Sequence, residues 1–393
     1  MTTSNVSLRS QPRLAARSFA IDGRFDLLDL YADNGFAWID GDHGFVASGV
    51  AAVVALEHAA ELLATIGHWA GADVPAGAGP RAVGALPFAA PGELVVPAVI
   101  VGRDSHGRAW RTVIDDVDAP YPVRSATREP EPSQFGITAT TTHAEWRSMV
   151  EHALTRIARE PLEKVVLARA VRIDADRPFD IPAILAFLHR SQPGCVVYAD
   201  RGFVGASPEL LVRKAGATVT ARPLAGTGID PAALARSTKD AHEHQLVVDA
   251  VVHALQTRCG DVVATGPATL ELADVAHLAT TITAHAESTA TTIADLVATL
   301  HPTPAVAGTP REIALETIDA LEPVARGRYA GPCGWIDRNG DGEFVIALRG
   351  GEIDGVHAVI HAGAGIVSAS DPDAEWVETQ QKLTPMLQAL VRP

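Results

Sequence analysis

Carboxylates recur at a spacing of three residues in two predicted helical segments of this chain. In DAEWVETQQK, Glu375 and Glu378 stand three apart and Lys382 follows four further on, so all three share one helical face. In KDAHEH, Asp240 and Glu243 repeat the acidic spacing. Two helices that each present two inward acids could chelate a hard cation such as Mg²⁺. Acids near a helix start also favour the macrodipole, and a Glu–Lys pair at i, i+4 is often an ordinary ion pair, so both alternatives stay open on spacing alone.

An amine and a carboxyl outside these helices are candidates for proton transfer. Lys164 begins KVVLARAVRI, an otherwise apolar strand, and Glu209 follows the Ser-Pro of GASPELL. Both residue types are usually solvated at such places. Burial would favour the neutral form of the lysine, which could then act as a general base, and would make the carboxyl a proton donor.

Three loops rich in small residues could bring backbone N–H groups close to ligand oxygens. They are RPLAGT (222–227), RYAGPCGW (328–335) and AGAGIV (362–367). Tight β-turns are the alternative explanation for each loop taken singly. No P-loop, GxGxxG, GxSxG or HExxH motif accompanies them.

The elements that must position these residues are clearest after residue 135. Apolar spacing predicts a helix from Trp146 to Ile157, ended by Pro161. Capping boxes at Ser237 and Ser370 predict helices to Gly260 and to about Leu390. Strands are predicted over 164–173, over 203–214 as strand–turn–strand, over 335–353 as a hairpin, and over HAVIHAGAGIV.

The N-terminal third carries weaker signals. We predict one Ala-rich helix near Val50 to Trp69 and one buried strand over Leu94–Val101. The proline-rich stretch 117–136 is the best candidate for an internal linker. Strands outnumber helices and consecutive strands look antiparallel, so the predicted fold class is α+β.

Composition excludes several kinds of partner. The 393 residues carry a net charge of −15 and no basic cluster, which argues against nucleic acid. No apolar run is long enough to cross a membrane. Three widely spaced cysteines fit a reduced, cytoplasmic protein. Residues 1–19 are expected to form a flexible N-terminal tail, and an anionic ligand would need local positive charge.

Taken in order, the motifs resemble the chorismate-utilising enzymes. They run through EKVVLAR, GASPELL, RPLAGT, KDAHEH, HLATTI, HPTPAVAG, RYAGPCGW, ALRGGEI, AGAGIV and EWVETQQK, over residues 135–390. The resemblance implies one chorismate-binding domain over 20–393, built from two packed antiparallel sheets flanked by helices. It also implies Mg²⁺ as cofactor, chorismate as the small-molecule substrate, and Lys164 and Glu209 as general base and acid.

The same resemblance implies the ligands of the metal and the substrate. Glu243 and Glu378 resemble direct Mg²⁺ ligands, while Asp240 and Glu375 match acids that act through water. Asp240 stands where the family usually has glutamate, so its reach is shorter. The residues that resemble a site for the carboxylates and ring of the substrate are Gly226, Thr227, His277, Tyr329, Arg349, Gly363, Gly365 and Lys382.

Within the family, the resemblance favours the isochorismate synthases. A lysine at 164 implies water as nucleophile, rather than ammonia from a glutaminase partner as in anthranilate synthases. Ala305 is apolar where salicylate synthases tend to carry threonine. The alternatives are a salicylate synthase, a glutaminase-dependent subunit, or a protein that binds chorismate without turnover. We expect a monomer, and the motifs do not distinguish menaquinone, siderophore or salicylate as the destination of isochorismate.

Overall fold

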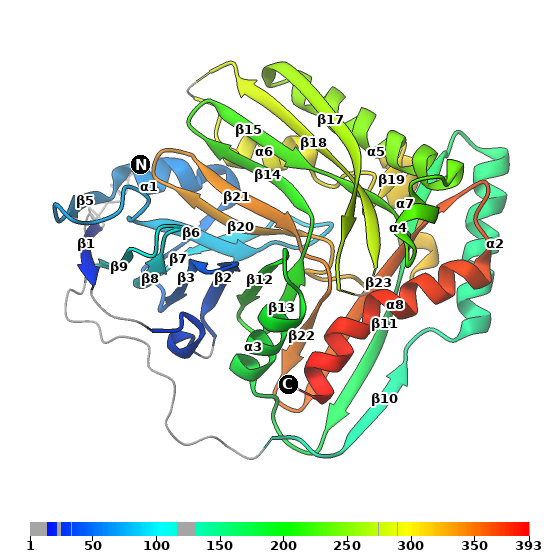
Figure 1. Ribbon diagram of the computed structural model, residues 1–393, viewed down its shortest axis with the longest axis horizontal. Coiled ribbons are helices and arrows are strands. Elements are labelled where there is room, and N and C mark those ends of the chain that lie inside the picture. Colours follow the sequence, from blue (N-terminus) through cyan, green and yellow to red (C-terminus); the bar gives the residue numbers. More distant parts are fainter. Residues whose placement is uncertain are drawn as a thin grey trace, which may run out of the picture.

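The computed structural model describes residues 14–21, 25–32, 34–115, 131–273, 275–288 and 290–392. In these residues two large β-sheets lie together, and helices cover them (Figure 1). The strands pair antiparallel except for β1 with β5. The predicted α+β fold with two antiparallel sheets is therefore confirmed.

The first sheet has 13 strands. In spatial order they are β10 (Phe135–Ala139), β11 (Lys164–Ala175), β23 (His357–Val367), β22 (Gly350–Asp354), β13 (Phe203–Ser207), β12 (Val196–Asp200), β2 (Phe36–Asp40), β3 (His43–Ser48), β8 (Val99–Arg103), β9 (Ala109–Ile114), β1 (Ala15–Ile21) and β5 (Gly67–Ala70), with β19 (Gly308–Thr309) on β11.

The second sheet has 10 strands. Their order is β16 (Leu224–Gly228), β18 (Ala276–Ala286), β15 (Thr218–Arg222), β14 (Leu210–Ala215), β21 (Gly342–Ile346), β20 (Pro332–Asp337), β6 (Arg81–Ala85), β7 (Glu93–Val96) and β4 (Ala52–Ala55), with β17 (Cys259–Glu271) on β18.

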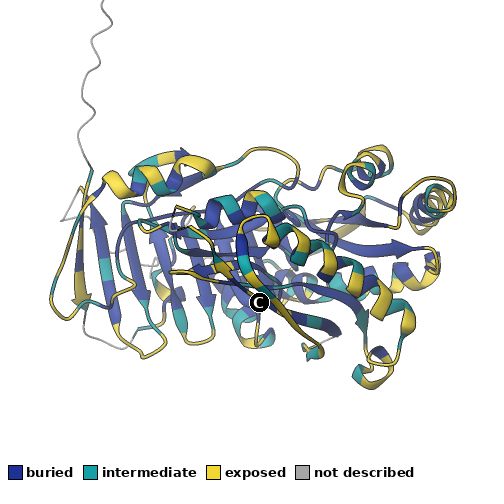
Figure 2. Cartoon of the chain, turned by 90° about the horizontal axis from the view of Figure 1, so that it is seen from above, coloured by how far each residue is buried: buried dark blue, intermediate teal, exposed yellow. Residues whose placement is uncertain are grey.

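Helices complete the packing around both sheets. They are α1 (Ala59–Thr65), α2 (His143–Arg159), α3 (Ile181–Ser191), α4 (Pro231–Leu234), α5 (Thr238–Gln256), α6 (Ile293–Leu300), α7 (Arg311–Leu321) and α8 (Pro372–Val391), with short 3₁₀ turns at Leu28–Leu30 and Leu56–His58. Buried strands run through the middle of the molecule, and the exposed residues lie on outer helix faces and loops (Figure 2). No helix among the described residues is long and apolar enough to span a membrane.

Aromatic side chains fill the space between the two sheets. Phe36, Trp38 and Phe45 from the first sheet pack against Val83 and Val345 from the second, and all are buried. A second core lies under α3 and α8 on the first sheet, where Leu185, Leu188, Met386 and Leu390 are at most 1% exposed. Burial of such side chains is worth about 1.5–3 kcal/mol each, which makes these layers the main support of the fold.

Most of the predicted elements after residue 135 are present. Thr142 caps α2 with Glu145 in a complete capping box, and Ser237 caps α5 by accepting from the Asp240 N–H. The predicted strands correspond to β11, β13, β14 and β23, and the predicted hairpin is β20–β21. The last residues of the predicted hairpin segment belong to β22, which joins the first sheet instead.

Two N-terminal predictions are wrong. The long helix near Val50–Trp69 is only α1, flanked by β4 and β5, because edge pairing with β7 and β1 takes the residues on either side. The single strand over Leu94–Val101 is two strands, β7 and β8, which belong to different sheets. Pro97 lies between them, and a residue without an N–H group suits a break in strand pairing.

Two further details differ from expectation. Residues 15–19 of the predicted tail form part of β1, while residues 1–13 lie outside the described residues, as does most of the candidate linker at 117–136. The cap of α8 is Asp371 rather than Ser370, with a carboxylate that accepts from two backbone N–H groups. The helix α8 itself ends at Val391, close to the predicted end at about Leu390, and contains Pro385.

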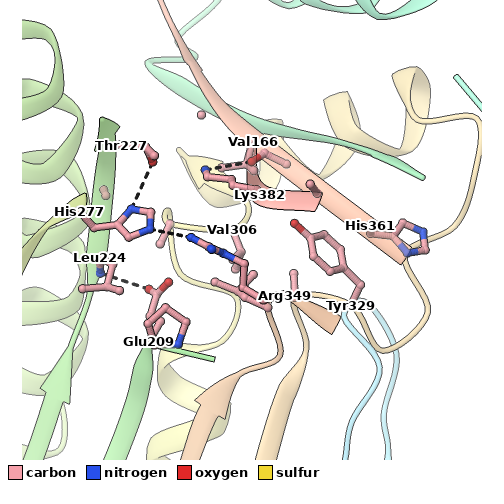
Figure 3. A pocket seen from close by; sticks show the side chains of 18 of the residues that line it. Val166, Glu209, Leu224, Thr227, His277, Val306, Tyr329, Arg349, His361 and Lys382 are labelled. Carbon is pink, nitrogen blue, oxygen red and sulfur yellow. Dashed lines mark hydrogen bonds between the residues drawn. The ribbon is translucent and has the colours of Figure 1, made fainter. Parts of the chain in front are cut away.

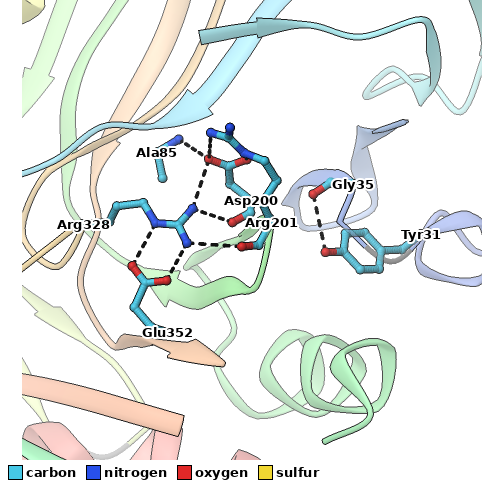
Figure 4. A network of polar contacts seen from close by, with 7 residues as sticks. All are labelled: Tyr31, Gly35, Ala85, Asp200, Arg201, Arg328 and Glu352. Carbon is cyan, nitrogen blue, oxygen red and sulfur yellow. Dashed lines mark hydrogen bonds and ion pairs between the residues drawn. The ribbon is translucent and has the colours of Figure 1, made fainter. Parts of the chain in front are cut away.

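A polar network ties the strands behind the candidate site together (Figure 4). Arg328 forms an ion pair with Glu352 of β22 and donates to the Asp200 carbonyl at 2.7 Å. The Asp200 carboxylate accepts from the Ala85 N–H of β6 at 2.9 Å. The network joins both sheets next to Tyr329, and therefore holds the segment that carries this side chain.

Candidate active site

One enclosed cavity collects most of the residues that the sequence singled out. It lies where β11 and β23 of the first sheet face β16 and β18 of the second (Figure 3). The predicted site residues that line it are Glu209, Gly226, Thr227, Glu243, His277, Tyr329, Arg349, Gly363, Gly365 and Lys382. Lys164, Asp240, Glu375 and Glu378 are not among its lining residues.

Glu209 lies in the turn between β13 and β14 and is only 3% exposed. Its Oε1 accepts one bond from the Leu224 N–H at 3.4 Å. Burial raises the pKa of this carboxyl to about 7, although the Leu224 N–H and the charges of Lys164 and Lys382 oppose the increase. The predicted buried carboxyl is therefore present, and near neutral pH it holds a proton that it can donate.

Lys164 is fully buried at the start of β11, with its amine 2.9 Å from Glu243 Oε1. The amine forms an ion pair there but no hydrogen bond with any described residue. Gly365 stands beside both groups: a Cβ at this position would lie 2.3 Å from Glu243 Oε1 and 2.9 Å from Lys164 Cε. The glycine is required because α5, β11 and β23 approach one another so closely here.

His277 and Arg349 form a fixed pair on another wall of the cavity. Arg349 Nη2 lies 3.0 Å from His277 Nε2, and a guanidinium can only donate, so Nε2 is the acceptor. The proton is therefore on Nδ1, which donates to the Gly226 carbonyl at 3.1 Å. Burial and the charge of Arg349 keep the pKa of His277 well below its usual value, so this imidazole is neutral.

Lys382 projects from α8 toward the same space. Its amine pairs with Glu378 at 2.7 Å and donates to the Gly363 carbonyl at 3.1 Å. Burial is the largest effect and lowers the pKa of Lys382, but the charge of Glu378, its hydrogen bond and the nearby Tyr329 together raise the pKa above its usual value, so the amine is cationic. Together with Arg349 it gives this acidic protein a local positive site for an anion.

The four predicted metal acids stand close to this site, and lysines hold three of them. Glu243 pairs with Lys164, Glu378 with Lys382, and Glu375 with Lys239 at 2.7 Å. Asp240 lies close to Gly226: a Cβ at Gly226 would be 2.9 Å from Asp240 Cβ, and the φ of +74° at Gly226 is one that residues with side chains rarely adopt. Burial and the neighbouring Glu378 raise the pKa of Glu375.

The donor chemistry of these acids suits Mg²⁺. No three His, Cys, Asp or Glu side chains of the described chain stand close enough to hold an ion without rearrangement. Mg²⁺, however, needs only one or two carboxylates and completes its shell with water and ligand oxygens. Glu243 and Glu378 are carboxylates that at present pair with lysines, so their chemistry fits Mg²⁺. The metal-ligand set remains a prediction.

The structure adds residues that the sequence reasoning did not single out. Arg326 and His361 line the cavity, and His361 stacks on Tyr329 with ring centroids 5.2 Å apart. Arg326 pairs with Glu322 at 2.6 Å and donates to the Val166 and Val306 carbonyls. The i, i+4 spacing from Glu322 was the available signal for this pair.

Comparisons with known proteins agree with these observations. A family model described as "Chorismate binding enzyme" matches residues 95–391. A Mycobacterium tuberculosis (strain ATCC 25618 / H37Rv) protein, provisionally named isochorismate synthase MenF, is 40% identical over 350 residues, covering 80% of this chain and 87% of that protein. Isochorismate synthase MenF of Bacillus subtilis (strain 168) is 39% identical over 261 residues, which cover 63% of this chain and 55% of that protein.

A solved structure resembles the chain over nearly its whole length. It is MenF, the menaquinone-specific isochorismate synthase from Escherichia coli, with a TM-score of 0.82 and 27% identity. The match covers 98% of this chain and 97% of that one. The two sheets therefore belong to an architecture already known from experiment.

Proposed function

This chain belongs to the family of chorismate-binding enzymes, and we propose that it isomerises chorismate to isochorismate. The observation that carries the proposal is Glu209, a buried carboxyl with a pKa of about 7 that lines the cavity within electrostatic reach of Lys164. A proton donor that lines the cavity, with a potential base beside the lining residue Glu243, suits a reaction that adds water at one ring carbon and removes a hydroxyl from another.

The substrate is a dianion, and the cavity offers it matching groups. Arg349 and Lys382 bind the two carboxylates, with Thr227 and the backbone at Gly226, Gly363 and Gly365. His277 holds Arg349 by accepting its hydrogen bond, which fixes the guanidinium for bidentate contact with a carboxylate. Tyr329, backed by His361, lines the wall beside the ring.

Two proton transfers complete the isomerisation. Lys164 takes a proton from water as the water oxygen bonds to C2, the ring double bond shifts, and the C4–O bond breaks. Glu209 gives its proton to the departing C4 hydroxyl, which leaves as water. One water enters and one leaves, so the net reaction is an isomerisation. General base and general acid each typically contribute about 10²–10⁴-fold to such a rate.

Mg²⁺ is the proposed cofactor, held directly by Glu243 and Glu378 and through water by Asp240 and Glu375. When bound, it supplies Lewis-acid stabilisation of charge on the ring carboxylate. Glu243 is also the ion-pair partner of Lys164. The proposed metal ligand and the proposed base are therefore in direct contact.

Product analysis tests this function. Purified protein is incubated with chorismate and Mg²⁺, and the products are separated by chromatography; isochorismate is expected. Salicylate with pyruvate as the main products would instead identify a salicylate synthase. Anthranilate formed with ammonia would identify the glutaminase-dependent branch, and binding without any product would identify a non-catalytic chorismate-binding protein.

We also propose that the enzyme acts as a cytoplasmic monomer without a glutaminase partner. The three cysteines are free and buried, which suits a reducing compartment. The lysine at 164 supports water as the nucleophile, so an ammonia-supplying subunit is not needed. Gel filtration of the purified chain, alone and with a glutaminase subunit, would test both statements.

A further inference from the structure

Glu243, Glu375 and Glu378 form what we call the acidic cluster, and each is paired with one lysine. Lys239 differs from the other two lysines. Lys164 and Lys382 have proposed roles with water and substrate. Lys239, at the start of α5, is absent from the lining of the cavity and has no such role. Its amine lies 2.7 Å from Glu375 Oε1 on α8.

The pair is not an ordinary surface salt bridge. The Glu375 side chain is 2% exposed, whereas that of Lys239 is 31% exposed. Breaking a pair with one buried partner leaves that carboxylate uncompensated, unlike an exposed pair, which contributes little. The arrangement joins a fixed buried acid to a cation that can withdraw toward solvent.

The charge of Lys239 also acts on the rest of the cluster. Glu243 and Glu378 attract its ammonium in addition to Glu375. Lys239 therefore contacts one carboxylate of α8 and offsets the charge of two more on α5 and α8, which would otherwise repel one another more strongly across the junction of the two helices. A bound divalent cation would offset the negative charge of the same carboxylates.

We propose that Lys239 is a tethered counter-cation that holds the acidic cluster together without metal and sets the Mg²⁺ affinity by competing for the same carboxylates. This inference rests on the proposed metal site and deepens it. Lys239 is a positioning residue, since it acts through Glu375. When Mg²⁺ binds, repulsion moves the amine outward, which its partial exposure permits.

Removal of the charge should therefore tighten metal binding. In Lys239→Met, a competing positive charge is lost and the cluster gains net negative potential. Mg²⁺ titrated into the chorismate-free protein by calorimetry should bind at least about tenfold more tightly than to wild type. The metal-free variant should melt at a lower temperature, and saturating Mg²⁺ should raise its melting temperature more than that of wild type.

Two control variants separate charge from packing. Lys239→Arg keeps the positive charge and should keep nearly wild-type Mg²⁺ affinity. Lys214→Met breaks another lysine–carboxylate pair, Lys214 with Asp341 at 2.6 Å, in which the lysine rather than the acid is the more buried partner and whose residues do not line the cavity. Lys214→Met should lower the melting temperature without changing Mg²⁺ affinity. If Lys239 had only a structural role, Lys239→Met would give this same result.

The outcomes distinguish this inference from the proposed function. Unchanged or weaker Mg²⁺ binding by folded Lys239→Met would overturn the role of Lys239 and leave the isomerase proposal standing. If wild type binds Mg²⁺ but makes no isochorismate, the function fails while the affinity comparison still decides the inference. If wild type binds no Mg²⁺ at all, both the metal site and the inference fall.

Discussion

At the residue scale, Glu209 shows how surroundings turn a common side chain into a proton donor. The carboxyl is enclosed by its turn, receives one N–H group, and has no ion-pair partner within 4 Å among the described residues. Lys164 is the opposite case, a buried amine with a carboxylate partner at 2.9 Å. The mechanism requires the first group protonated and the second neutral.

The pH dependence of catalysis should report the Glu209 carboxyl. Because the proposed acid must be protonated, kcat/KM should fall as the pH rises through about 7. The measurement is a pH profile of kcat/KM for isochorismate formation with saturating Mg²⁺. A profile that stays flat from about pH 6 to pH 8.5 would exclude Glu209 as the proton donor.

The stability of the protein should depend on the same group. Its folded pKa, about 7, lies above the ordinary 4.5, so its contribution to stability is fully present below pH 4.5 and is lost as the pH rises through 7. Glu209→Gln removes the ionised buried carboxylate and should be more stable than wild type at pH 8, by up to about 3 kcal/mol. Denaturant unfolding of both proteins at pH 5 and pH 8 measures this effect. The same difference in unfolding free energy between variant and wild type at both pH values would contradict it.

Substitution of Lys164 should abolish turnover. Lys164→Ala and Lys164→Arg should each lose at least about 10²-fold in kcat, because neither supplies a base. The arginine variant is the sharper test, since it keeps a cation beside Glu243 yet does not deprotonate in proteins. Circular dichroism checks that it is folded, and a folded, active arginine variant would remove Lys164 from the chemistry.

At the element scale, the site depends on how closely α5, β11 and β23 approach one another. In the antiparallel register Val166 lies opposite Gly365 and Lys164 opposite Val367. The small residues of AGAGIV therefore provide space for side chains of the neighbouring elements. A turn was the alternative interpretation of this segment, and the structure shows a continuous strand instead.

A single methyl group at this junction should be disruptive. In Gly365→Ala the new Cβ would meet Glu243 Oε1 at 2.3 Å, so the Lys164–Glu243 pair must shift. We expect about 1–3 kcal/mol of lost stability and a large loss of kcat, measured by denaturant unfolding and initial rates. Gly136→Ala on β10 is the control, because the atom nearest to a Cβ there, the Asp174 carbonyl oxygen, would be 3.9 Å away, and activity should be retained. Equal activity of both variants would contradict this account of the junction.

At the scale of the whole molecule, the N-terminal third is part of the same two sheets. The strand β2 pairs with β12 in the first sheet, and β6 pairs with β20 in the second. Strands from before residue 115 thus complete both sheets, while the polar groups that line the cavity come from later segments. The first 115 residues support the site without contributing to its lining.

Removal of the N-terminal third should prevent stable folding. A chain beginning at residue 131 would expose the edges of β12 and β20 together with the aromatic core between the sheets. Unpaired apolar edges favour aggregation, so the truncated chain should elute as aggregate in size-exclusion chromatography. A monodisperse truncated chain with native circular dichroism would show that the later segments fold independently.

Local patterns in the sequence were sufficient for several of the elements that carry the site, although β16 lies where a loop was predicted and β18 was not predicted. Apolar spacing and capping residues predicted α2 and α5, and strand periodicity predicted β11 and β23, because these signals act over a few residues. The ordered motifs also singled out ten residues that line the cavity, together with Lys164, Asp240, Glu375 and Glu378, which do not. The N-terminal predictions failed because edge pairing and Pro97, rather than local helix preference, determine the strands there.

Only the tertiary structure decided how these residues are charged and paired. That Lys164 faces Glu243, that Lys239 faces Glu375, and that Glu209 is enclosed all depend on strands and helices far apart in the chain. Burial and electrostatic attraction depend on distance in space, which no spacing along the sequence specifies. The residue types were therefore readable from the sequence, whereas their protonation and partners followed from the packing of two sheets around one cavity.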